Sequence, residues 1–267
     1  MIRALTFTDI PGLNQLPPAD WKFDYEDFLH QFMHEDFFYA FVLLKEGKIV
    51  GTGNVLLQEK TGWLGNIIVD QNSRGQGLGT KITQFLVDFL SDKGCETLVL
   101  IATELGEPIY RKIGFQKITD YLCFDSVSDL DYAPHPSIRP LQAADQKAVT
   151  LLDADINGEN RTHLIHKFYT SGVGYFDATN TLLGFYLPHF GRGLVLSKDP
   201  KAGLELLQYK HTQQGKRTLL PVDNHEGATL LQKMGLTQGP NSCKMLLGKP
   251  NNWKPECIFS YGSGYCG

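Results

Sequence analysis

The chain has 267 residues, enough for one or two domains, and its content of 42% apolar and 20% charged residues is ordinary for a folded globular protein. A formal net charge of −4 gives no basic excess, so nucleic acid is not expected as a partner. No apolar run approaches the roughly 18 residues of a membrane span, and the N-terminus lacks the apolar stretch of a signal peptide. The five cysteines show no zinc-ligand spacing, so no metal is expected. Their odd number without a signal peptide favours reduced thiols and a cytoplasmic location.

The first half of the chain alternates between strand and helix patterns. Residues 2–5 predict a first strand, and Thr8 and Asp9 offer an N-cap for a short helix that Pro11 and Gly12 are expected to interrupt. Aromatic residues at helical spacing predict a helix over 21–38. Apolar runs between turn signals predict further strands, which are expected at 39–44, 49–57, 63–69, 97–102 and 118–124.

A glycine-rich turn joins the strand that ends at Val69 to a long helix. The turn reads Arg-Gly-Gln-Gly-Leu-Gly over residues 74–79, and apolar residues recur at steps of three and four from Ile82 to Leu90. Backbone N–H groups at a helix N-terminus have no intrahelical partners and lie at the positive end of the helix dipole, so the turn predicts a pyrophosphate cradle. The chain lacks the Gly-Lys-Ser/Thr of a nucleotide P-loop and the acid expected of a dinucleotide fold.

The same turn and a second motif farther along resemble the Gcn5-related N-acetyltransferases (the GNAT superfamily). Arg74 with Gly77, or Gln76 with Gly79, satisfies the opening of that family's acetyl-CoA motif, Arg/Gln-x-x-Gly-x-Gly/Ala. Residues 109–115, Ile-Tyr-Arg-Lys-Ile-Gly-Phe, are similar to the family's closing Tyr-x-x-x-Gly-Phe signature. Glycine turns before helices are common, so the turn alone is weak, but the two motifs in this order are much more specific.

The second half of the chain repeats features of the first. After a polar, proline-broken linker at 125–137, residues 138–145 carry Ile, Arg, Leu and Asp in register with residues 2–9. Residues 218–236 align on residues 97–115 without a gap, at an offset of 121. Two echoes at opposite ends of one unit indicate a tandem duplication.

The second copy departs from the first where the chemistry is expected. In place of the glycine-rich turn it has residues 194–203, a shorter loop with a proline and an aspartate, and Leu231 stands where the first copy has Tyr110. The resemblance implies an α/β (α+β) fold of two tandem acetyltransferase-like domains, each a central mixed, mostly antiparallel sheet flanked by helices. The acetyl-CoA-binding domain is expected at 1–128. A degenerate domain that shapes substrate binding or dimerisation is expected at 137–267.

The resemblance also assigns candidate site residues. In this family the strand before the cradle splays from its neighbour and binds the pantetheine arm through free backbone groups, which here belong to Ile67, Ile68 and Val69. The residues that carry over to the pyrophosphate are Arg74, Gly75, Gln76, Gly77, Leu78, Gly79 and Thr80. Acyl transfer needs a polarised thioester carbonyl and a proton for the leaving thiolate, which the Val69 N–H and the Tyr110 hydroxyl can supply. The alternative for Tyr110 is a core aromatic on an amphipathic helix.

The general base and the amine stay open. Residues 63–68 carry no acid where relatives often place a glutamate, so a water chain, Glu104, His34 or Asp36 remain alternatives. The expected function is direct transfer of an acetyl group from acetyl-CoA to a primary amine of a small molecule. The alternative is a non-catalytic acyl-CoA-binding or sensing module. Neither the acceptor nor the existence of a homodimer can be predicted from these residues.

Overall fold

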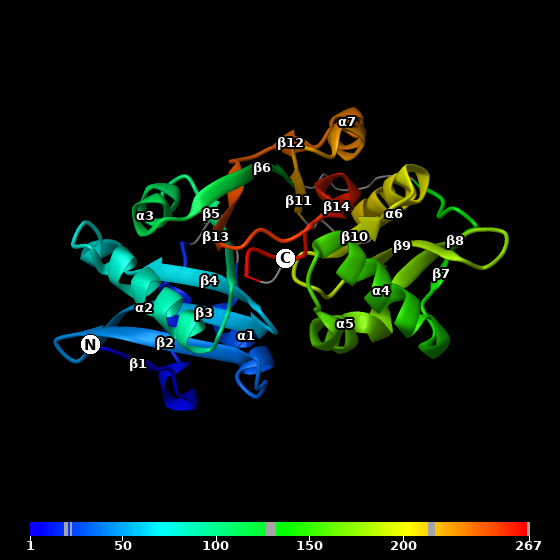
Figure 1. Cartoon of the computed structure of the whole chain (residues 1–267). Coiled ribbons are helices and arrows are strands. Elements are labelled where there is room, and N and C mark those ends of the chain that lie inside the picture. Colours follow the sequence, from blue (N-terminus) through cyan, green and yellow to red (C-terminus); the bar gives the residue numbers. More distant parts are fainter. Residues whose placement is uncertain (19–20, 22, 126–131, 213–216, 266–267) are drawn as a thin grey trace. The chain divides into compact units, whose positions relative to one another are not determined.

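The chain divides into two compact units. The computed structural model describes residues 1–18, 21, 23–125, 132–212 and 217–265 (Figure 1). The first unit comprises Met1–Gln116 and Met245–Lys249, and the second comprises Lys117–Lys244 and Pro250–Tyr265. Residues 126–131 of the predicted linker lie outside the described residues. The division into domains at 1–128 and 137–267 stays a prediction.

The first unit is built on a mixed sheet (Figure 1). Its strands lie in the order β1 (Ile2–Ala4), β2 (Phe38–Lys45), β3 (Lys48–Gln58), β4 (Thr61–Val69) and β5 (Thr97–Thr103). Neighbours from β1 to β4 are antiparallel, and β4 and β5 are parallel. The prediction of a mixed, mostly antiparallel sheet is confirmed. Tight turns such as Glu46-Gly47 join antiparallel neighbours, whereas the parallel pair needs a helical crossover.

Helices cover both faces of this sheet. They are α1 (Tyr25–Phe32), α2 (Leu78–Asp92) and α3 (Glu107–Ile113). α2 packs closely on β3, because a Cβ added at Gly53 would stand 2.9 Å from a methyl carbon of Leu86. Side chains alternate along a strand, so Thr52 faces the opposite side, where its hydroxyl oxygen lies 2.7 Å from that of Tyr25 on α1. The helix predicted over 21–38 is therefore present but shorter, since Asp24 caps its start by accepting from the Asp27 N–H at 2.9 Å.

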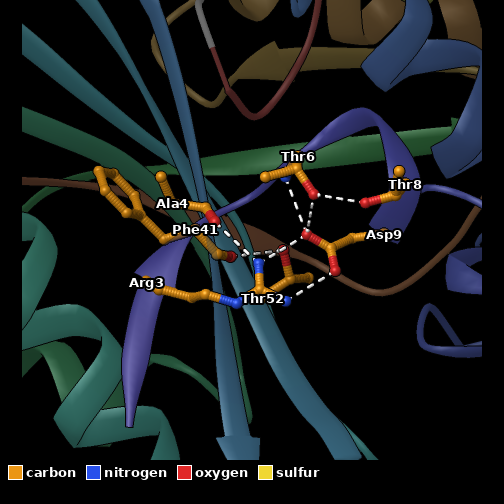
Figure 2. A network of polar contacts seen from close by, with 7 residues as sticks. All are labelled: Arg3, Ala4, Thr6, Thr8, Asp9, Phe41 and Thr52. Atoms are coloured by element: carbon orange, nitrogen blue, oxygen red, sulfur yellow. Dashed lines mark hydrogen bonds and ion pairs between the residues drawn. The ribbon is translucent and has the colours of Figure 1, made fainter.

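The short helix predicted at Thr8 and Asp9 is wrong. The segment Phe7–Asp9 is a 3₁₀ turn instead. Figure 2 shows why: the Asp9 carboxylate accepts from the Arg3 guanidinium at 2.6 and 2.7 Å and from the Thr6 N–H at 2.8 Å. These bonds close a tight turn, and Pro11, which has no N–H, prevents its extension into a regular helix.

The same arrangement recurs in the second unit. Arg139 donates to the Asp145 carboxylate at 2.7 and 3.1 Å, and the Gln142 N–H donates to it at 2.8 Å. A 3₁₀ turn over Ala143–Asp145 again follows the strand. The local structure thus repeats where the sequence echo predicts it, at residues 138–145.

The second unit contains a five-stranded sheet of antiparallel neighbours, in the order β14 (Ile258–Ser260), β10 (Leu194–Ser197), β9 (Leu182–Leu187), β8 (Val173–Phe176) and β7 (Ile138–Pro140). Its helices are α4 (Gln146–Asn157), α5 (Thr162–Phe168), α6 (Pro200–Thr212) and α7 (His225–Lys233). Strand β6 (Gln116–Asp125) pairs antiparallel with β11 (Thr218–Pro221) and β12 (Thr237–Gln238). Along the chain, β13 (Ser242–Gly248) passes from the second unit into the first. Within the described residues, no helix combines the length and apolar character needed to cross a membrane.

The second sequence echo also has a structural counterpart. β11 and α7 follow one another as β5 and α3 do: β11 begins at the offset of the alignment, and α7 begins three residues before the position that the offset gives. The N–H of Phe115 donates to the Tyr110 carbonyl at 3.1 Å, and the N–H of Leu236 donates to the Leu231 carbonyl at 3.1 Å. Both helices therefore end in the same closing turn.

A buried ion pair lies inside the second unit. The Arg161 side chain is fully buried and donates to Asp153 at 3.1 and 2.5 Å. Replacing one partner leaves an uncompensated buried charge, so Arg161→Met should lower the free energy of unfolding by about 3–5 kcal/mol. The double variant Asp153→Leu/Arg161→Met should lose clearly less. Urea unfolding of the three proteins measures this, and equal losses in the single and double variants would contradict it.

Candidate active site

Strand β4 is open along part of one edge. It pairs with β5 as far as Trp63 opposite Val99, whereas its other edge stays paired with β3 up to Val69. The Asp70 N–H donates to the Val50 carbonyl at 2.9 Å. Because backbone groups alternate between the two edges of a strand, the Val69 N–H points to the edge that β5 leaves unpaired. Backbone groups at the end of β4 are therefore available to a ligand.

The strand carries a bulge just before this open end. Thr52 pairs with Ile68, but Asn54 pairs with Gly65, so β4 has one more residue than β3 across this interval. Asn66 in the bulge takes a φ of 48°, in the left-handed region where asparagine is enriched. Bulges bend a strand and re-aim its side chains, and here the bend coincides with the separation of β4 from β5.

The turn after β4 presents unpaired backbone donors. Lys81 makes the first α-helical bond of α2, its N–H donating to the Gly77 carbonyl at 3.0 Å. The N–H groups of residues 75–80 donate no hydrogen bond within the described part of the chain. Gly77 takes a φ of 74°, and a Cβ there would meet no atom within 4 Å. The space beside Gly77 is therefore open, and the donors of the turn lie at the positive end of a helix.

Two cations lie at this turn. The Arg74 Nε donates to the Val69 carbonyl at 3.1 Å, and the Lys45 Nζ donates to the Gln76 Oε1 at 2.7 Å. Arg74 is exposed, so its remaining guanidinium donors can reach an anion. Free N–H groups and two positive side chains together suit a pyrophosphate.

Tyr110 lies half-buried on α3. Its ring lies against Gly106, where a Cβ would stand 2.8 Å from a ring carbon, and meets Phe115 at 6.1 Å between ring centroids. Its hydroxyl forms no hydrogen bond with any described residue, and burial raises the pKa of the phenol above its ordinary value. A Cβ at Gly79 would stand 3.2 Å from Ile109, so α3 abuts the first turn of α2. Tyr110 thus belongs to a helix that adjoins the cradle.

The candidate bases from the sequence are not brought to this site by any contact between described residues. His34 is exposed and packs on Phe7, with 4.9 Å between ring centroids. Asp36 and Glu104 are exposed. No cluster of three or more metal-ligating side chains occurs among the residues that the structure describes.

The corresponding helix start in the second unit is already capped. Asp199 Oδ1 accepts from the Ala202 N–H at 2.8 Å, and Pro200, at the first helical position, has no N–H to offer. A carboxylate of the chain itself thus occupies the place of an incoming anion. Asn224 is likewise a cap, since its Oδ1 accepts from the Gly227 N–H at 2.8 Å.

Comparison with protein-family models decides the identity of the first unit's main segment. Residues 9–115 match the model described as the acetyltransferase (GNAT) family. This segment is a GNAT acetyltransferase domain. The matched region of the GNAT domain begins after β1 and includes the open edge of β4, the glycine-rich turn and α3, so both motifs lie within it.

Individual relatives agree with this assignment. A glucosamine 6-phosphate N-acetyltransferase of Trypanosoma brucei brucei is 32% identical over 77 residues, which are 26% of this chain and 52% of the relative. The chain therefore spans about half the length of that relative. The similarity covers about a quarter of this chain, not the whole chain.

Solved structures extend the likeness beyond the GNAT domain. A putative acetyltransferase of Pyrococcus horikoshii has a TM-score of 0.83 at 16% identity and covers 100% of this chain and 95% of its own. A tandem GNAT protein from the clavulanic acid biosynthesis pathway has a TM-score of 0.62 at 13% identity, covering 94% and 99% of the two chains. These likenesses show the fold, an α/β arrangement with sheets flanked by helices.

Proposed function

We propose that this protein is an acetyl-CoA-dependent N-acetyltransferase that transfers the acetyl group directly to a primary amine of a small molecule. The observation that carries the proposal is the combination of an open β4 edge with a turn of free N–H groups directly after it. A half-buried tyrosine, Tyr110, whose hydroxyl bonds to no described residue, lies on the helix next to that turn.

Each residue of the site has a role that follows from its position. Backbone groups of Ile67 and Val69 bind the pantetheine arm along the open edge, as an added strand would, whereas those of Ile68, which the sequence also nominated, point to β3, where Ile68 pairs with Thr52. The N–H groups of residues 75–80, with Arg74, bind the pyrophosphate. The Val69 N–H polarises the thioester carbonyl, and the Tyr110 hydroxyl protonates the leaving sulfur.

The second unit has a supporting role in this proposal. Its α6 start is capped by Asp199, and Leu231 replaces the tyrosine, so it does not bind acetyl-CoA in the corresponding place. It shapes substrate binding or mediates dimerisation. Acetyl-CoA should bind with one site per chain, and isothermal titration measures that number.

Thiol release from acetyl-CoA across a panel of amines tests the proposed activity. Glucosamine 6-phosphate belongs in the panel because relatives named for it match part of this chain. An amino acid amide, a polyamine and an aminoglycoside complete it. We expect release that depends on one class of amine and is absent without amine. Tight acetyl-CoA binding without amine-dependent release would favour a sensing module instead, and no binding at all would refute the cradle.

A further inference from the structure

Two asparagine side chains meet at the β4 bulge. Asn66 Nδ2 donates to Asn54 Oδ1 at 2.8 Å. Asn54 is fully buried, and its own Nδ2 has no hydrogen-bond partner. Asn66 is half-buried, and its Oδ1 accepts no hydrogen bond from any described residue. Because the Nδ2 of Asn66 is held by Asn54, the oxygen of Asn66 is the atom left for a ligand.

The position of this pair relates it to the candidate active site. Asn66 follows Trp63, the last β4 residue that pairs with β5, and precedes Val69, whose N–H faces the open edge. Asn66 therefore lies on the stretch of β4 that β5 leaves unpaired, directly before residues 67–69, to which the proposed function assigns the pantetheine arm and the thioester carbonyl. The unmade hydrogen bond of the pair belongs to the buried Asn54 Nδ2, at a cost of about 1–3 kcal/mol, whereas the half-buried Asn66 Oδ1 is the acceptor that the pair leaves uncommitted.

No acid or histidine contacts this pair within the described residues. Strands β3, β4 and β5 carry a single titratable side chain, Lys48 at the turn end of β3. On α1, the Glu26 carboxylate accepts from the Gly12 N–H at 2.9 Å, and the Asp27 carboxylate accepts from Gln31 at 2.6 Å. The Tyr25 hydroxyl is bonded to Thr52. The remaining charged groups of α1 are Asp24, which caps the helix, and the exposed His30.

We infer that the Asn66 Oδ1 binds the N–H of the attacking amine, and that the acceptor is a weakly basic primary amine that is partly neutral at physiological pH. This inference rests on the proposed function. A neutral amide oxygen orients an amine without stabilising its protonated form as a carboxylate would. Because no acid or histidine contacts the pair among the described residues, this site depends on amine that is already neutral.

The chemistry then favours α-amino or amino-sugar nitrogens over alkylamines. An α-amino group with a pKa of about 7.7–8.0 is about one-tenth neutral at pH 7, whereas an alkylamine near pKa 10.4 is less than about one-thousandth neutral. The neutral nitrogen forms a bond to the carbonyl carbon as the C–S bond breaks. Tyr110 protonates the departing sulfur, and the surplus proton of the nitrogen passes through water and restores the Tyr110 phenol.

The substitution Asn66→Gly tests the role of the side chain. Glycine adopts a φ of 48° freely, so it removes the amide while keeping the bulge. We expect the KM for the amine to rise about tenfold, the size of one lost hydrogen bond, with acetyl-CoA binding unchanged. Asparagine at this position could instead serve only to adopt the left-handed backbone conformation. In that case Asn66→Gly will have the wild-type KM for the amine, while Asn66→Ala will lower the free energy of unfolding. This result would show that the inference is wrong.

The amine panel tests the substrate class. At pH 7 the best weakly basic amine should exceed the best alkylamine in kcat/KM by at least about tenfold, because higher nucleophilicity offsets only part of the difference in neutral fraction. Turnover led by alkylamines would overturn this inference and leave the proposed function standing. If acetyl-CoA binds but no amine in the panel is acetylated, both this inference and the proposed function would be overturned.

Discussion

Replacing Gly77 with valine should raise the dissociation constant of acetyl-CoA by about 100-fold or more. Gly77 precedes the first turn of α2 with a φ of 74°, and the N–H groups around it donate to nothing else in the described chain. A β-branched side chain both fills the open space beside the turn and moves the donors. Loss of two charge-assisted hydrogen bonds, at about 1.5–3 kcal/mol each, accounts for a change of this size. Isothermal titration with acetyl-CoA measures it.

The other end of the same helix offers a matched control. Gly94 has a φ of 81°, and a Cβ there would also meet nothing within 4 Å. Valine should therefore strain the backbone at either glycine by about 1–2 kcal/mol, but Gly94→Val should leave acetyl-CoA binding intact. Equal weakening of binding by both substitutions would attribute the effect to helix stability, and the cradle would be misplaced.

The central stretch of the GNAT domain is predictable because its signals are local. The apolar run that ends at Val69, the glycine turn and the helical spacing from Ile82 to Leu90 specify β4, the turn and α2 within one short segment. Each element buries its apolar residues against its neighbours in the chain, so periodicity alone locates it. Tyr110 is located by its motif in the same way.

Contacts between segments that are far apart in the sequence could not be predicted from local patterns. Residues Met245–Lys249 complete the first unit, where the Thr97 Oγ1 donates to the Lys249 carbonyl at 2.7 Å across 152 positions of sequence. A short strand such as β13 has the same sequence pattern whichever strand it pairs with, so its sequence does not predict which unit it joins. For the same reason the linker composition indicates a break in the chain but not the limits of the compact units.

The asparagine pair shows a second limit. Asn66 could be read from the sequence as a polar residue within a strand, but its partner Asn54 lies on the neighbouring strand. The bulge that brings them together depends on a register shift between β3 and β4, which periodicity does not encode. The sequence alone indicates that β4 carries no acid. That the Asn66 amide pairs with Asn54 and keeps its oxygen uncommitted could be learned only from the structure.

Replacing Tyr110 with phenylalanine should lower kcat by about 100-fold and leave the dissociation constant of acetyl-CoA nearly unchanged. Phenylalanine keeps the ring against Gly106 and Phe115, so only the hydroxyl is lost. A positioned general acid contributes about 10²–10⁴-fold to such a step. Single-turnover thiol release at saturating amine separates the chemical step from binding.

The pKa of Tyr110 gives this prediction a second measurement. Burial raises it above the usual value of about 10, so the phenol stays protonated at neutral pH and remains an acid. The fall in kcat that follows its ionisation should therefore lie above about pH 10 and be absent in Tyr110→Phe. Tyr39→Phe is the matched control, because Tyr39 packs on Phe89 of α2 without a hydrogen bond from its hydroxyl in the described chain. If both substitutions leave kcat unchanged, the thiolate takes its proton from water, and Tyr110 is a packing residue of α3.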